Sequence, residues 1–365
     1  MSRAVRDRLL LIHPGALGDL VQARDAFARI RTANPQADLA ILTATSAADL
    51  ARSFGLFDTV MLFDDRAAYH GGPVLRARAL AAALLAARRF APTRAGVFKA
   101  ATVYAALARA TGARVRVGLT RGAGARFLTE PIPLLPGEHW ADRYDAIAAA
   151  RGGNAARDAS AWRLEPLPEP LDRAVAAMRS TADVLVALAP GGARSVKGEL
   201  GQKRWPRANY AELARRLLAE YGDVGFLLLG APSDRADTDA VRAAVPNACV
   251  LDLTGQTSLV EARAVIAHAD LFVGNDSSLL HLAATTRTPI VTIFGPTDPR
   301  AMAPRGAHVR WLWAPRGGVP CHDEITGVLG PCDGTCCIER VTPDEVLHAA
   351  RELLAAARPT AVRTA

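Results

Sequence analysis

The chain has 365 residues, of which half are hydrophobic and 22% are charged, and this composition excludes a disordered or collagen-like protein. Because a single core rarely extends over this length, we expect about two domains. Lys and Arg outnumber Asp and Glu by 44 to 36, but only Lys99, Lys197 and Lys203 are lysines. The charge is expected to be spread along the chain without basic blocks, which disfavours nucleic acid as a partner.

The sequence offers no clear membrane or export signal. Its longest run of small apolar residues, 79–87, is far shorter than the ~20 residues of a membrane span. Pro14 and Gly15 interrupt the apolar run near the N-terminus before it reaches the length of a signal peptide. We therefore expect a cytoplasmic protein whose cysteines are reduced.

Short β-type runs alternate with Ala- and Leu-rich stretches of helical period, as in βαβ units with a parallel sheet. The strands expected in a first sheet are residues 9–12, 39–43, 59–63, 96–98 and 115–119. The segment 127–138 contains Pro131, Pro133 and Pro136, and we expect it to leave this sheet and cross to the next domain.

A second set of strands is expected at residues 184–188, 224–229, 248–253, 271–273 and 290–294. Residues 164–170 include three prolines and are expected to link the domains. The apolar spacing over 343–357 predicts a helix that packs on a domain face. The fold class is therefore α/β with mostly parallel sheets, divided into domains 1–165 and 166–342 and a C-terminal helix and tail, 343–365.

The first stretch that could carry chemistry is LLLIHPGALGDLV, a strand followed by a glycine-containing turn and a helix starting near Asp19. A helix that follows a parallel strand is a common ligand site. Gly15 and Gly18 do not have the spacing of a dinucleotide fingerprint, and the second strand lacks a terminal acid, so a dehydrogenase is disfavoured. Asp19 either stabilises the helix start or accepts a proton from a substrate hydroxyl.

The second stretch, LAPGGARSVKGELGQKRWP, leaves a strand at Gly191 and Gly192 and enters a helix near Pro206. It holds Lys197 and Lys203 in a chain that otherwise uses arginine. A retained lysine indicates a site for a compact charge, such as a phosphate-binding site. The alternative for both lysines is a solvated loop.

The third stretch is VGNDSSLLHLAATTRTPIVTIFGPTDP. Asp276 is expected to cap a helix over 277–286, so that the N–H groups of Ser277 and Ser278 face the edge of the sheet. His281 lies one turn into that helix. A lone histidine is more often structural, but the neighbouring acid and hydroxyls favour a functional role here.

Other polar groups have simpler explanations. Ser258 and Glu261 have the spacing of a capping box, and Asp237 and Asp239 are better explained as acids near a helix start than as a metal motif. His322 and four cysteines could supply zinc ligands, although the cysteines lack the paired C-x2-C spacing of common structural zinc sites. Reduced, packed thiols are the simpler interpretation. The four cysteines are Cys321, Cys332, Cys336 and Cys337. We expect no metal and no cofactor.

Together, in order and spacing, these three stretches resemble the ADP-heptose:lipopolysaccharide heptosyltransferases, glycosyltransferase family nine. The resemblance extends over almost the whole chain. It implies the GT-B architecture, two facing Rossmann-like domains with the acceptor on the N-terminal domain and the donor on the C-terminal one. It also implies metal-independent, inverting transfer of a heptose from ADP-heptose to a hydroxyl of a lipopolysaccharide-core-type acceptor.

By matching position, the resemblance implies that Asp19 is the catalytic base and Lys203 binds the diphosphate. The other donor-binding residues that it implies are Asp276, Ser277, Ser278, His281, Gly191 and Gly192. Further candidates for acceptor or phosphate contacts are His13, Gly18, Arg194 and Lys197.

Three alternatives stay open at this point: the same chemistry with another nucleotide sugar or another glycan or natural-product acceptor, a sugar-nucleotide epimerase of similar shape, and a noncatalytic nucleotide-sugar binder. The expected partners are a nucleotide-sugar donor and an anionic glycan or glycolipid acceptor, without nucleic acid. Peripheral association with the inner membrane surface is left open.

Overall fold

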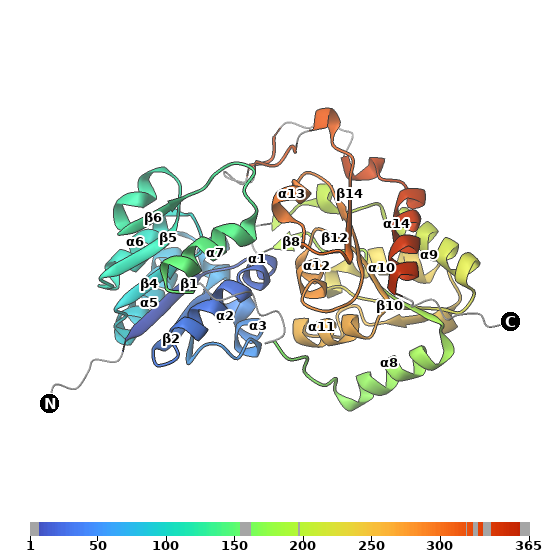
Figure 1. Cartoon of the computed structure of the whole chain (residues 1–365), viewed down its shortest axis with the longest axis horizontal. Helices are drawn as coiled ribbons and strands as arrows, with labels where there is room; N and C mark the ends of the chain where they lie inside the picture. Colours follow the sequence, from blue (N-terminus) through green and yellow to red (C-terminus); the bar gives the residue numbers. More distant parts are fainter. Residues whose placement is uncertain are drawn as a thin grey trace. The chain divides into compact units, whose positions relative to one another are not determined.

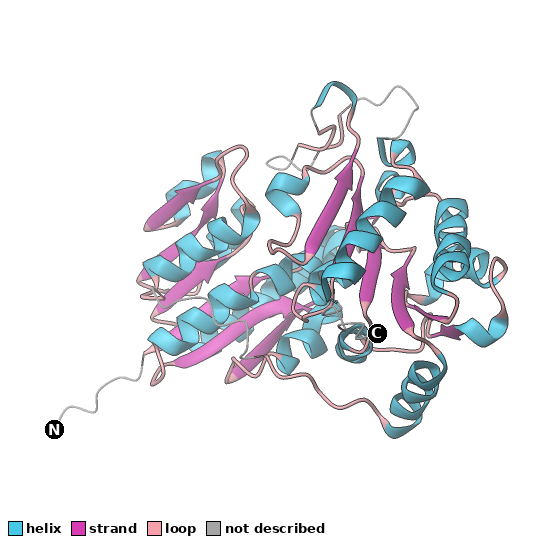
Figure 2. Cartoon of the chain, turned by 45° about the vertical axis from the view of Figure 1, so that its right-hand side comes forward, coloured by secondary structure: helices cyan, strands magenta, loops and turns pink. Residues whose placement is uncertain are grey.

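The computed structural model describes residues 7–153, 162–195, 198–318, 320–323, 328–330 and 337–357. The chain forms two compact units, Met1–Arg163 with Ser195–Lys197, and Leu164–Arg194 with Gly198–Ala365. The first unit is coloured blue to green in Figure 1 and the second green to red, and Figure 2 shows strands flanked by helices in each unit. Within the described ranges no helix combines the length and the apolar character needed to cross a membrane.

The first unit contains a six-stranded, fully parallel sheet in the order β3-β2-β1-β4-β5-β6. Its strands are β1 (Arg8–His13), β2 (Asp38–Ala44), β3 (Thr59–Phe63), β4 (Arg94–Val97), β5 (Val115–Thr120) and β6 (Glu130–Pro133). Its helices are α1 (Leu17–Gln22), α2 (Arg24–Ala33), α3 (Ala48–Ser53), α4 (Asp65–His70), α5 (Pro73–Phe90), α6 (Thr102–Ala110) and α7 (Trp140–Ala150). The central strand β1 is a continuous apolar run because helices cover both faces of the sheet.

The expectation that residues 127–138 leave the first sheet is wrong, since β6 is its sixth strand. β6 lies at the edge and pairs with β5 alone, with Pro131 opposite Gly118 and Pro133 opposite Thr120. An edge strand needs hydrogen bonds on one side only, which is why prolines are tolerated there. β4 also begins and ends earlier than the expected 96–98.

The second unit has a six-stranded parallel sheet in the order β11-β10-β7-β12-β13-β14. Its strands are β7 (Val184–Ala189), β10 (Val224–Leu228), β11 (Val250–Asp252), β12 (Leu271–Asn275), β13 (Ile290–Phe294) and β14 (Val309–Trp313). β8 (Arg194–Ser195) and β9 (Gly198–Glu199) form a separate two-stranded sheet. The helices of the second unit are α8 (Glu169–Thr181), α9 (Arg207–Tyr221), α10 (Arg235–Arg242), α11 (Leu259–Ala267), α12 (Ser278–Ala283), α13 (Pro299–Met302) and α14 (Pro343–Ala357).

Several local predictions for the second unit are confirmed. Ser258 and Glu261 form the capping box of α11, in which each side chain binds the other residue's backbone N–H. The helix expected over 343–357 is α14, and Val346 and Leu353 on its apolar face are buried in a core shared with α9. Strand β14 was not predicted.

Both sheets reverse their strand order beside their first strand, since β1 lies between β2 and β4, and β7 lies between β10 and β12. In such doubly wound sheets, ligands bind outside the carboxyl ends of the strands at this reversal. The carboxyl ends of β1 and β4, and those of β7 and β12, are therefore where functional side chains are expected.

Candidate functional site

Asp19 and Lys99 form an ion pair at the carboxyl ends of β1 and β4. Asp19 lies in the first turn of α1 beside Gly18, and Lys99 follows β4 by two residues. The two side chains are 25% and 22% exposed, so the pair is accessible from solvent. The ammonium fixes the position of a carboxylate that can still meet a substrate.

Lys99 is a site residue that the sequence analysis missed. Its ammonium also lies 5.9 Å from the centre of the Trp140 ring, at the start of α7. The signal that could have revealed it is the pairing of strands β1 and β4. Because these strands are parallel, their carboxyl ends lie together, and Lys99 is the first charged residue after β4.

His13, expected as an acceptor or phosphate contact, is fully buried, and the structure gives it no surface for a substrate. Its ring packs against Phe27 and Tyr144, with centroids 6.0 and 6.2 Å away. Burial lowers the pKa of His13 to about 3, with a further lowering by the Lys99 charge and an opposing effect of Asp19. The imidazole is therefore neutral near pH 7 and acts as part of the aromatic core beneath the Asp19–Lys99 pair.

Acid is expected to destabilise the protein through His13. The unfolded chain takes up a proton near the ordinary pKa of 6.5, whereas the folded chain does so only near 3, so stability falls as pH drops below about 6.5. The loss at pH 5 relative to pH 7 should be about 2 kcal/mol. Chemical denaturation at both pH values should show this loss for the wild type and His70→Gln, an exposed control, but not for His13→Gln. Equal acid sensitivity of His13→Gln would contradict this account.

The second cluster is centred on Lys203 and Asp276, which form an ion pair of 2.6 Å next to β12. Their side chains are 14% and 4% exposed. The Thr297 hydroxyl donates to the same Asp276 oxygen at 2.7 Å, and Nε2 of His281 is 3.9 Å from the other oxygen. Burial would raise the pKa of Asp276, but Lys203, His281 and the hydrogen bonds outweigh it and lower that pKa.

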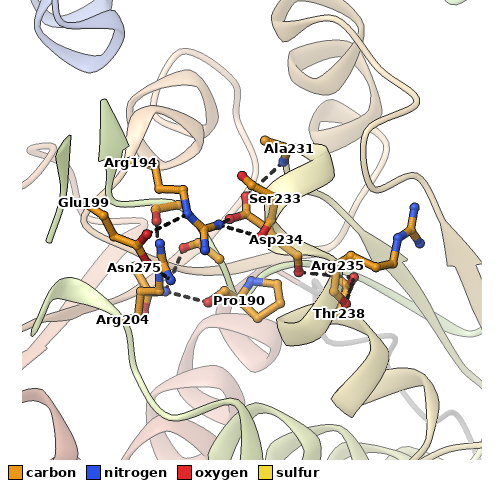
Figure 3. A network of polar contacts seen from close by, with 12 residues as sticks. Pro190, Arg194, Glu199, Arg204, Ala231, Ser233, Asp234, Arg235, Thr238 and Asn275 are labelled. Carbon is orange, nitrogen blue, oxygen red and sulfur yellow. Dashed lines mark hydrogen bonds and ion pairs between the residues drawn. The ribbon is translucent and has the colours of Figure 1, made fainter. Parts of the chain in front are cut away.

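Asn275, the last residue of β12, organises this cluster and was also missed. Its side-chain oxygen accepts hydrogen bonds from the Trp205 backbone N–H and the Tyr210 hydroxyl, both at 3.0 Å. Its amide nitrogen donates to the carbonyls of Pro190 and Gly191, at 2.9 and 3.0 Å, and Figure 3 shows its place in the network. One buried amide thus joins the loop after β7 to the start of α9.

Asn275→Ala is expected to lower the free energy of unfolding by about 3 kcal/mol, because it leaves buried donors and acceptors without partners. Asn247→Ala, at an exposed position of the same unit, should change it by less than about 0.5 kcal/mol. Chemical denaturation of both variants tests this, and equal small effects would show that Asn275 does not hold the loop.

Gly191 and Gly192 allow close approach of the backbone to two functional segments. A Cβ on Gly191 would lie 2.2 Å from the Asp234 side chain, and Gly192 has a φ of +89° with Ser277 only 2.8 Å from where its Cβ would be. Side chains at these positions would force the loop away from Asp234 and Ser277. Gly191 therefore lets the loop after β7 lie against Asp234 at the start of α10, and Gly192 lets it lie against Ser277 at the start of α12.

Arg194 and Arg204 lie on this loop, and protein carboxylates hold both (Figure 3). Arg194 pairs with Asp234 at 2.5 Å and with Glu199 at 3.2 Å. Arg204 pairs with Glu199 at 2.6 Å and donates to the Gly192 carbonyl at 2.8 Å. These guanidinium groups lower the pKa of Glu199, mainly through the hydrogen bond from Arg194. A phosphate contact of Arg194 stays a prediction.

The prediction that Asp276 caps the next helix is wrong. β12 runs on to Asn275, the N-cap of α12 is Ser277, and the Asp276 carboxylate is instead bound by Lys203 and Thr297. The helix is also shorter than the expected 277–286. Ser278 and His281 lie within α12, and the Ser277 hydroxyl is buried without a hydrogen bond among the described residues.

Lys197, Cys332 and Cys336 lie outside the described residues, so the structure does not describe the proposed cysteine cluster as a whole. Cys321 and Cys337 are described and form no disulfide. In the part of the chain that is described, no group of three or more His, Cys, Asp or Glu side chains is placed to hold a metal.

Three comparisons connect this geometry to known proteins. The family model for glycosyltransferase family 9 (heptosyltransferase) matches residues 95–328. Lipooligosaccharide heptosyltransferase 2 of Haemophilus influenzae is 38% identical over 106 residues, which is 28% of this chain and 30% of that protein. The match thus spans about a third of this curated relative.

Solved structures share the fold over nearly the whole chain. The structure of E. coli ADP-heptose lps heptosyltransferase II has a TM-score of 0.70 and 21% identity, and covers 96% of this chain and 99% of that one. A glycosyltransferase of family 9 from Veillonella parvula has a TM-score of 0.76 and 18% identity, with 96% and 98% covered.

Two Rossmann-like units with their polar side chains at the strand reversals define an α/β protein of the GT-B class. Since the family model matches well over half of the chain, the protein belongs to glycosyltransferase family 9, the heptosyltransferase family.

Proposed function

We propose that this protein transfers a heptose from ADP-heptose to a hydroxyl of a lipopolysaccharide-core-type acceptor, with inversion and without a metal. The observation that carries the proposal is the ion pair between the partly buried Lys203 and the buried Asp276 beside β12, within the part of the chain that the family model matches. The names of the relatives, a lipooligosaccharide heptosyltransferase and an ADP-heptose lps heptosyltransferase, support the choice of donor and acceptor.

The proposed reaction is a single displacement at the anomeric carbon. The acceptor oxygen bonds to that carbon as the bond to the ADP oxygen breaks, and the hydroxyl proton passes to Asp19. One displacement inverts the configuration, so one carboxylate acting as general base is sufficient. We place acceptor binding on the first unit with Asp19, and donor binding on the second.

Lys203 is proposed to stabilise the negative charge that develops on the departing diphosphate. Its ammonium has three N–H donors, and the bond to Asp276 uses one of them. Asp276, itself held by Thr297, fixes the ammonium before the donor arrives, which is the arrangement that favours charge stabilisation in a transition state. Ser277, Ser278 and His281 are proposed to contact the donor from α12.

Mass spectrometry of the product tests the function. Purified protein given ADP-heptose and a truncated core acceptor should yield the acceptor plus one heptose, with release of ADP. UDP- and GDP-sugars in place of ADP-heptose test the alternative donors. NMR of ADP-heptose alone should show no isomerisation, whereas isomerisation without acceptor would identify an epimerase and overturn the proposal.

A further inference from the structure

The positive charge of this chain is concentrated in one segment of the first unit. Residues 66–129 contain eleven arginines, Lys99 and not a single Asp or Glu, whereas the rest of the chain has more acidic than basic residues. The expectation that the charge is spread along the chain is therefore wrong. So long a segment without an acid produces a strong local positive potential wherever its side chains reach the surface.

Three helices at or within this segment form one layer on one face of the first sheet. α5 buries Ala79, Ala83 and Ala87 in a core that also contains residues of β1 to β4 and of α6. Arg88 of α5 donates to the carbonyl of Ala110 at the end of α6, at 2.8 Å. α4 packs on α5, so the three helices are continuous. We call the outward side of this layer the α4–α6 face.

The outward side of α5 is both apolar and basic. Opposite its buried alanines lie residues at i, i+4, i+7, i+11 and i+14, namely Val74, Arg78, Ala81, Leu85 and Arg88. Val74 is 71% exposed and Leu85 is 51% exposed. Single exposed apolar residues are ordinary, but here they alternate with arginines along one helix.

Two further apolar side chains extend the patch: Leu75 of α5 is 50% exposed and Val103 of α6 is 42% exposed. Arg66 of α4 and Arg109 of α6 are exposed on the flanking helices. Arginines predominate around this apolar patch, and the nearest acids in the sequence are Asp64 and the buried Asp65 at the start of α4. Such a surface differs from an ordinary solvated helix face, where charges of both signs alternate.

Arg66 of the α4–α6 face follows Asp64 and Asp65 at the start of α4, but the other arginines of this face have no acidic neighbour in their own segment. Arg76 donates to the carbonyls of Gly71 and Tyr69, and such neutral acceptors leave the guanidinium charge uncompensated. Elsewhere in the segment, Arg94 pairs with Asp7, and Lys99 pairs with Asp19. Ion pairs thus neutralise Lys99 at the candidate site and Arg94 at the opposite end of β4, whereas among the described residues the exposed arginines of the α4–α6 face form none.

We propose that the α4–α6 face docks this protein on the surface of an anionic lipid bilayer. The arginines would bind headgroup phosphates, and Val74, Leu75 and Leu85 would enter the boundary between headgroups and acyl chains. Charge complementarity selects the anionic surface, and the exposed aliphatic side chains select a bilayer over a soluble polyanion. The proposal extends the proposed function, since a glycolipid acceptor lies in such a bilayer.

Co-sedimentation of the full chain with lipid vesicles tests the surface. The wild type should bind phosphatidylcholine vesicles that contain about 30% phosphatidylglycerol, but not pure phosphatidylcholine, and binding should fall as salt is raised. Arg78→Gln/Arg89→Gln removes two exposed arginines of α5, the second of them in its last turn. It should weaken this partitioning at least about tenfold, because each basic residue near the surface contributes measurably. Val74→Ser/Leu85→Ser should weaken it by a similar factor.

The matched control is Arg215→Gln/Arg242→Gln, which removes the same charge from exposed positions on α9 and α10 of the second unit and should bind like the wild type. The proposal is overturned if the wild type does not bind anionic vesicles, or if the control substitutions weaken binding as much as the face substitutions do. It is also overturned if the wild type binds heparin or RNA as tightly as it binds vesicles while Val74→Ser/Leu85→Ser binds vesicles normally.

Transfer to a soluble truncated acceptor separates this proposal from the proposed function. The face variants should keep wild-type turnover with that acceptor. For the wild type, normal turnover without vesicle binding would refute the docking surface alone, and vesicle binding without any transfer would refute the proposed function alone.

Discussion

Asp19→Asn is expected to lower the turnover number for sugar transfer by about 10³-fold, within the usual range for loss of a positioned general base. Asparagine has nearly the same shape but cannot accept the hydroxyl proton. The donor should still bind, because the proposed donor site is built from other residues around Lys203. Steady-state kinetics and calorimetric titration with ADP-heptose measure the two quantities separately.

The control for this variant is Asp49→Asn, which removes a carboxylate from an exposed position on α3 of the same unit. It should leave turnover and donor affinity unchanged. Asp19→Asn also leaves Lys99 without its partner, so Asp19→Asn/Lys99→Met should be as inactive as the single variant if the carboxylate itself performs the chemistry. Turnover above about a tenth of wild type in Asp19→Asn would remove Asp19 from the role of base.

Lys203→Met should lower kcat/KM by about 10²- to 10³-fold, since the departing diphosphate loses a preorganised positive charge. The same change leaves the Asp276 carboxylate buried and unpaired, at a cost of about 3 kcal/mol in the free energy of unfolding. Kinetics and chemical denaturation of one preparation report both effects.

A second substitution separates catalysis from folding. Lys203→Met/Asp276→Asn removes the unpaired charge and keeps an acceptor for the Thr297 hydroxyl, so it should recover most of the lost stability. Its activity should stay low because the ammonium is still absent. Recovery of activity together with stability would show that Lys203 only supports the fold.

The pH dependence of the stability that the Lys203–Asp276 pair contributes follows from the direction in which the Asp276 pKa is shifted. Because the pKa of Asp276 is lowered in the folded protein, the contribution of the pair to stability is present at neutral pH. It is lost on acidification, as the pH falls through that lowered pKa. Lys203→Met should therefore lose less stability than the wild type between pH 7 and strongly acidic pH.

The sequence by itself determined the α/β class, ten of the twelve strands of the two large sheets, the capping box of α11 and the helix α14. These elements rest on local signals: continuous apolar runs for strands buried on both faces, and side-chain spacing for helix starts. The three motif stretches also contain Asp19, Lys203 and Asp276, which stand out by their residue types in segments that follow predicted strands.

Only the tertiary structure decided two of the four edge strands, β6 and β14. Both are partly exposed, so neither has the continuous apolar run of a central strand, and each is defined by the neighbour with which it pairs. The prolines of β6 argue against a strand when only the local sequence is considered. At the edge of the sheet they are tolerated, because an edge strand needs hydrogen bonds on one side only.

The tertiary structure also decided which polar groups meet. Lys99 reaches Asp19, and Asp276 binds Lys203 in place of capping a helix, because parallel strands bring residues far apart in sequence to one edge of a sheet. Asn275 is a hub for the same reason. Sequence spacing describes neighbours along one element, whereas these contacts depend on strand order, which no local pattern contains.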